Sequence, residues 1–125
     1  MKIPKGLKIE DLVVGEGPVA TKGSRVTVHC TIRLRKGDVV RDTRQRNEPF
    51  QFTIGDRHEM AALEYGVLDM KMGGKRRITS PPAFAYRDAG IPGVVPPNAL
   101  LILEVEMLSI EPPSTSRLKS AVMEN

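Results

Sequence analysis

The side chains able to do acid–base, nucleophilic or metal chemistry are few and scattered. The 125-residue chain holds one cysteine, Cys30, and two histidines, His29 and His58. His29 falls on the polar side of a predicted strand and His58 at the start of a predicted helix, so the two form neither a metal site nor a catalytic dyad. Cys30 is more typical of a small buried hydrophobic residue than of a redox switch. We therefore expect no metal ion at a functional site.

A long loop combines many aliphatic residues with many helix- and strand-breaking ones. Residues 84–99 read FAYRDAGIPGVVPPNA. Its prolines interrupt both helix and strand and hold the loop stiff at low entropic cost. What the apolar side chains of such a stiff loop cover is the first question that the sequence raises.

The elements that would position this loop follow from residue periodicity. Residues 25–34, RVTVHCTIRL, alternate polar and apolar side chains, which is typical of a half-buried strand with Cys30 on its inner face. The last strand, LLILEVEMLSI, alternates in the same way. Further strands or extended segments are expected, so that the full set covers residues 7–14, 25–34, 38–42, 50–54, 75–80 and 100–110.

One segment changes to helical spacing. Within residues 58–68, Met60, Leu63 and Val67 recur on one face, and Asp56 is a candidate N-cap. A lone helix can bury its apolar stripe only against a sheet, so the strands are expected to curl around it. The predicted fold class is α+β, an antiparallel half-barrel of five to six strands wrapped around one short helix.

Length and composition fit one domain, which we assign to residues 1–110, followed by a polar and disordered tail over residues 111–125. The net charge of +4 is modest and does not point to a particular partner. No apolar run reaches the length of a signal-peptide core or a membrane span, so a cytoplasmic monomer is expected.

A series of spaced motifs runs from about Gly6 to Ile110. It includes VTVHCTIRL, PFQFTIG, GVLDMKMGGKRRI, and AY followed by IP, PPNALL and VE. In this order the motifs resemble the FKBP-type peptidyl-prolyl isomerases, which fold as a half-barrel on a short helix and bind a prolyl peptide between the two. The resemblance implies isomerisation of X–Pro bonds without a cofactor, and in many members binding of the macrolide rapamycin and its relatives. It also implies that Ile91, Val94 and Val95 are apolar because they wall the proline site.

This chemistry needs no nucleophile, base or metal. Rotation about an amide is slow because its partial double bond must break, with a barrier of about 18–20 kcal/mol. A catalyst must favour the twisted amide, by a dry apolar pocket shaped for it and a few hydrogen-bond donors that orient the neighbouring carbonyls.

At four positions the residue type matches that of the pocket in the resembled family. Tyr86 matches the tyrosine whose hydroxyl donates to a ligand carbonyl, and Met60 the residue whose backbone N–H donates to a second one. Phe50 and Val95 match apolar walls. A structural tyrosine bonded to its own loop remains the alternative for Tyr86.

Five further pocket positions depart from that family. Leu63 stands where most active members have the tryptophan that floors the pocket, and Cys30 replaces a wall tyrosine. Val40 and Leu103 each replace a phenylalanine, and Arg41 occupies the place of an aspartate. The resemblance thus implies a wider, less aromatic and more positive pocket, with weak isomerase activity and much reduced macrolide affinity.

The sequence also predicts which partners the charged residues beside this pocket have. A one-residue slip in a strand reverses the face of a side chain, so Asp42 cannot replace the aspartate unless a bulge intervenes. Arg46 matches the arginine that pairs with that aspartate and loses its partner here. Arg76 falls at an inward, usually small position, so its guanidinium needs solvent or Asp42.

The leading hypothesis is an isomerase that acts on proline-containing peptides or proteins during folding. The alternative is a non-catalytic protein-binding module on the same fold. A nucleic-acid-binding domain rests only on two basic stretches, residues 33–36 and 75–77, which have no interleaved aromatics. A solvated charged face explains those stretches better.

Overall fold

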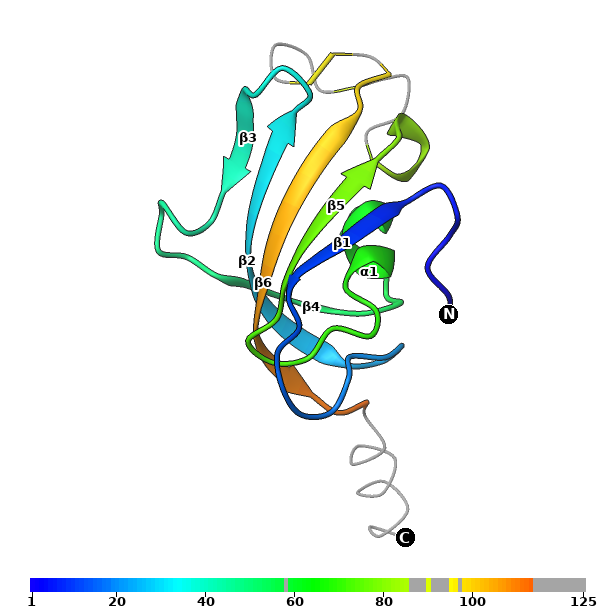
Figure 1. Cartoon of the computed structure of the whole chain (residues 1–125), viewed down its shortest axis with the longest axis vertical. Coiled ribbons are helices and arrows are strands. Elements are labelled where there is room, and N and C mark those ends of the chain that lie inside the picture. The colour runs from blue at the N-terminus through cyan, green and yellow to red at the C-terminus, as the bar shows by residue number, and fades with distance from the viewer. Residues whose placement is uncertain (58, 86–89, 91–94, 97, 114–125) are drawn as a thin grey trace, which may run out of the picture.

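The chain forms one antiparallel sheet with a single short α-helix, in a computed structural model that describes residues 1–57, 59–85, 90, 95–96 and 98–113. This confirms the predicted α+β half-barrel (Figure 1). The strands and helices are β1 Lys8–Val13, β2 Arg25–Leu34, β3 Val39–Asp42, β4 Phe50–Thr53, α1 Ala61–Gly66, β5 Lys75–Ser80, the 3-10 helix η1 Pro82–Phe84 and β6 Leu101–Glu111.

The strand order is β1-β5-β6-β2-β3, with β4 paired to β2 as well. β4 pairs the first half of β2 and β3 pairs the second half, so the two short strands lie along one edge. β6, the last strand in the sequence, lies between β2 and β5 and pairs with both (Figure 1). The sheet is therefore held together through its C-terminal strand.

The core lies between the inner face of the sheet and α1. Every second residue of β2 is buried, and so is every second residue of β6 from Leu101 to Met107, as the alternation predicts. The helix adds Ala62 and Leu63, both fully buried. Gly66 lets the helix approach β5 closely, because a Cβ there would lie 2.4 Å from Cδ1 of Ile78. The glycine that weakens α1 as an isolated helix is thus required by its packing.

The helix is shorter than the sequence predicts, and its expected cap is wrong. α1 begins at Ala61, because its N-cap residue Met60 has extended dihedral angles of φ −61° and ψ 148°. No side chain caps it, so Asp56 does not have the predicted role. The helix ends at Gly66, and the predicted residues 67–68 are outside it.

Arg76 also departs from its predicted surroundings. Its side chain is buried, and the residue is only 5% exposed. Its Nε donates to Oδ1 of Asp11 at 2.7 Å, and its Nη1 donates to the carbonyl oxygens of Gly66 and Leu68 at 2.9 and 2.7 Å. These carbonyls lie at the C-terminal end of α1, which favours a cation. Neither solvent nor Asp42 is needed, and Arg76 ties α1 to β1 and β5.

Two further observations apply to the described residues alone. They include no helix long and apolar enough to cross a membrane. They also include no group of three or more histidine, cysteine, aspartate or glutamate side chains able to hold a metal ion. Residues 114–125 of the predicted tail lie outside the described part.

Candidate functional site

The apolar pocket residues that the structure describes belong to the hydrophobic core or pack against it. Cys30, Leu63, Val95 and Leu103 are buried members of the hydrophobic core. Val40, Phe50 and Met60 are half-buried and pack against that core. The first group thus lies within the packed core and the second at its edge. That they wall a ligand pocket stays a prediction. Tyr86 and Ile91 lie outside the described residues, so their roles remain predictions.

Phe50 is the aromatic residue at this rim. It pairs with Val28 across β2 and β4, so its ring faces inward. The ring stacks on that of Phe52, with centroids 5.8 Å apart and an interplanar angle of 27°. Phe52 belongs to the core and Phe50 packs against it, and the role of Phe50 as an apolar wall stays a prediction.

The register of β3 decides which of its charged residues faces the crevice. Arg41 pairs with Ile32, which is fully buried, whereas Asp42 pairs with Thr31 on the outer face. The bulge falls between the pairs that Ile32 and Arg33 form with β3. It therefore precedes Arg41 in β3 and does not turn the Asp42 side chain inward. Asp42 instead accepts the backbone N–H of Gln45 in a local turn.

Arg41 lies over the ring of Phe50. Its Cζ is 4.1 Å from the centroid of the Phe50 ring, which is close enough for a cation–π contact. Its Nη1 lies 3.3 Å from Oε1 of Glu59, in the segment just before α1. Sequence reasoning missed Glu59 as a partner. The positive charge of the guanidinium is therefore balanced by Glu59, and the group covers one face of the Phe50 ring.

The segment before α1 is fixed by a buried carboxylate that the sequence analysis did not identify. Glu64 is 3% exposed and accepts three backbone N–H groups, those of Gly55, Arg57 and Glu59, at 2.7, 3.2 and 3.0 Å. The segment carries two positive φ angles, 100° at Gly55 and 63° at Arg57. Glu64 therefore holds a strained loop in one conformation.

That loop presents the backbone N–H of Met60. Met60 accepts hydrogen bonds through its carbonyl from Leu63 and Glu64, but its N–H donates to no other described residue. A backbone donor without a described acceptor, next to apolar side chains, can hold a ligand carbonyl. The family resemblance implies this role for Met60, and the role stays a prediction.

Cys30 should be inert in the folded protein. Burial raises the pKa of its thiol from 9.0 to about 12; Arg41 opposes this rise, and Glu59 and Asp42 add to it. At pH 8 such a pKa lowers the thiolate fraction about a thousandfold. We expect iodoacetamide to alkylate the native protein at least a hundredfold more slowly than the guanidinium-unfolded chain, as followed by mass spectrometry. Native and unfolded rates within tenfold of each other would contradict the buried position.

A known protein family matches most of this chain. The family described as FKBP-type peptidyl-prolyl cis-trans isomerase matches residues 17–108. The chain belongs to this family. It is 39% identical over 107 residues to peptidyl-prolyl cis-trans isomerase FKBP1A of Xenopus laevis, which covers 85% of this chain and 99% of that protein.

Other FKBP relatives are longer. The chain is 39% identical over 110 residues to the 46 kDa FK506-binding nuclear protein of Spodoptera frugiperda, covering 88% of this chain and 27% of that protein. It is 45% identical over 107 residues to FK506-binding protein 4 of Dictyostelium discoideum, covering 86% and 29%. The chain thus spans less than a third of the length of these two relatives.

Solved FKBP structures share the fold. AtFKBP13 matches with a TM-score of 0.78 at 31% identity, covering 86% of this chain and 95% of that one. FkpA from Escherichia coli matches with a TM-score of 0.76 at 28% identity, covering 87% and 53%. These matches confirm the half-barrel architecture and leave activity to be argued from the site.

Proposed function

We propose that this chain catalyses cis–trans isomerisation of X–Pro bonds in proteins during folding, with reduced activity. The observation that carries this proposal is the N–H of Met60, which donates to no other described residue and belongs to a residue that packs against the hydrophobic core. Twisting an amide removes its resonance and makes it less dipolar, so a dry wall favours the twisted form over the planar one. The N–H of Met60 holds a neighbouring carbonyl while the bond turns.

Two features argue for reduced activity. Leu63 fills the floor with a smaller contact surface than an aromatic ring offers. The guanidinium of Arg41 covers a face of Phe50, so a prolyl ring must share that face or displace the arginine from Glu59. The same two features predict weak macrolide binding.

The Arg41 cover also supports the alternative, a non-catalytic binding module. If the Arg41–Glu59 pair stays closed, the crevice holds a partner's side chain without giving its proline room to turn. The two functions predict different outcomes in one assay.

The test is cis-to-trans conversion of a tetrapeptide with a Leu–Pro bond, compared with the uncatalysed reaction. We expect measurable acceleration by the natural chain and about two- to tenfold higher kcat/KM for Leu63→Trp, because an aromatic contact is worth about 0.5–1.5 kcal/mol. Phe50→Ala should lower kcat/KM about tenfold. Circular dichroism checks that both variants fold.

If neither the natural chain nor Leu63→Trp accelerates conversion, the enzyme proposal is wrong. Chemical-shift changes at Met60 on adding a prolyl peptide would then favour the binding module. We further propose that the protein works as a monomer in the cytoplasm. Because two relatives are named as nuclear proteins, cell fractionation is the direct check of the compartment.

A further inference from the structure

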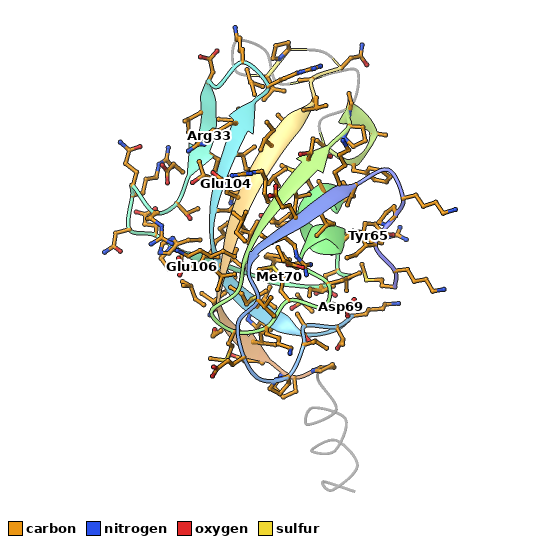
Figure 2. The ribbon with its side chains drawn as sticks, viewed as in Figure 1. Arg33, Tyr65, Asp69, Met70, Glu104 and Glu106 are labelled. Carbon is orange, nitrogen blue, oxygen red and sulfur yellow. The ribbon has the colours of Figure 1, made fainter. Side chains whose placement is uncertain are left out.

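A second hollow lies on the outer side of α1, away from the sheet. Its volume is about 570 Å³, within the range of ligand sites. The N-terminal segment, the loop before α1, the helix and η1 all contribute to its walls. Ala61 and Tyr65, one helical turn apart, face this hollow, whereas Ala62 and Leu63 face the core. Figure 2 shows Tyr65 projecting from α1 on the side where the N-terminal segment runs.

The floor of this groove is apolar and partly aromatic. Tyr65 and Phe84 supply two half-buried rings, and Met1 adds a flexible apolar side chain. The Phe84 ring is held by the N-terminal segment, since a Cβ on Gly6 would lie 2.9 Å from its Cε2. Two rings and a methionine form a surface suited to an apolar side chain of a ligand.

The groove is lined by two carboxylates and two cations, which differ in how they are paired. Its two carboxylates are already satisfied, because Glu64 accepts three backbone N–H groups and Glu59 pairs with Arg41. Its two cations, Lys22 and Arg57, form no ion pair with any described residue. The groove therefore offers two cations that have no ion-pair partner among the described residues, next to the rings of Tyr65 and Phe84.

We propose that this groove binds an extended polypeptide segment in which acidic residues flank an apolar side chain. Carboxylates pair with Lys22 and Arg57, and the apolar side chain packs on Tyr65 and Phe84. Glu59 joins the groove to the mouth of the crevice through Arg41, so a substrate can occupy both. That last step rests on the proposed isomerase function; binding to the groove does not.

The direct test uses a fluorescein-labelled peptide without proline, Asp-Glu-Phe-Asp-Leu, and measures its anisotropy in 50 mM salt. We expect binding that weakens about three- to tenfold with Lys22→Glu or with Arg57→Glu, and at least about tenfold with both. The control variant changes Arg35 and Lys8 to glutamate. It alters the net charge equally, and neither residue lines the groove or forms an ion pair with a described residue. Its affinity should stay within about twofold of the natural chain.

Four results would overturn the proposal. They are no binding of the peptide at millimolar concentration, equal weakening by the control variant, equal binding of Lys-Lys-Phe-Lys-Leu, and tighter binding of a mixed-sequence single-stranded oligonucleotide. None depends on turnover, so a failed isomerase assay leaves this test intact. If the isomerase is active, placing the acidic segment next to Leu–Pro should lower KM with little change in kcat.

Discussion

Replacing Arg76 with methionine should lower the free energy of unfolding by about 3 kcal/mol. The change removes three hydrogen bonds of a buried guanidinium and leaves the carbonyl oxygens of Gly66 and Leu68 without that donor. An orphaned buried polar group costs about 1–3 kcal/mol. Urea denaturation of both proteins at neutral pH measures the difference.

The matched control is Asp11→Asn. The Asp11 side chain is 46% exposed, so losing its charge should cost less than about 1 kcal/mol and leave the two carbonyl contacts in place. Equal losses in the two variants would mean that the salt bridge, and not the helix end, is what Arg76 stabilises. A gain of stability in the methionine variant would mean that desolvation of the guanidinium outweighs its bonds.

Replacing Glu64 with alanine should have a similar effect on the free energy of unfolding, a loss of about 3 kcal/mol. Three backbone N–H groups lose their acceptor, and the segment from Gly55 to Glu59 is released. Because this segment positions the N–H of Met60, binding of a prolyl peptide should fall with stability. Thermal unfolding and an amide NMR spectrum of the variant measure both effects.

A glutamine at position 64 should lie between the natural protein and alanine. Its single carbonyl oxygen can serve Gly55 and Arg57, but its NH2 group then faces the N–H of Glu59. The exposed residue Glu48 provides a control, and Glu48→Ala should change stability by less than about 0.5 kcal/mol. If Glu64→Ala were equally mild, the loop would not depend on this carboxylate.

The strands could be predicted because their signal is local. Side chains alternate along a strand whatever its partner is, so the inward positions of Cys30 and Leu103 follow from their neighbours in sequence. The sheet's curl around one helix follows from the need to bury the apolar face of that helix. The positions assigned to Tyr86 and Ile91 remain predictions.

The polar contacts of the site could not be predicted, because they join distant residues. Arg41 reaches Glu59 across 18 positions, and Arg76 reaches Asp11 across 65. The loop before α1 is fixed by the side chain of Glu64, which reaches back from the helix to the backbone N–H of Gly55. This contact outweighs the local capping signal at Asp56. Sequence patterns identify which charges need partners, whereas the packed structure selects the partners.

The central position of β6 has a consequence for how the protein is made. Without residues 101–111, β1 and β5 form one fragment of sheet and β2, β3 and β4 form another, with no hydrogen-bonded strand between them. On the ribosome, these residues are synthesised after every strand that they must join. The nascent chain should therefore stay sensitive to protease until β6 leaves the exit tunnel, and a stop codon before residue 101 should yield no folded product.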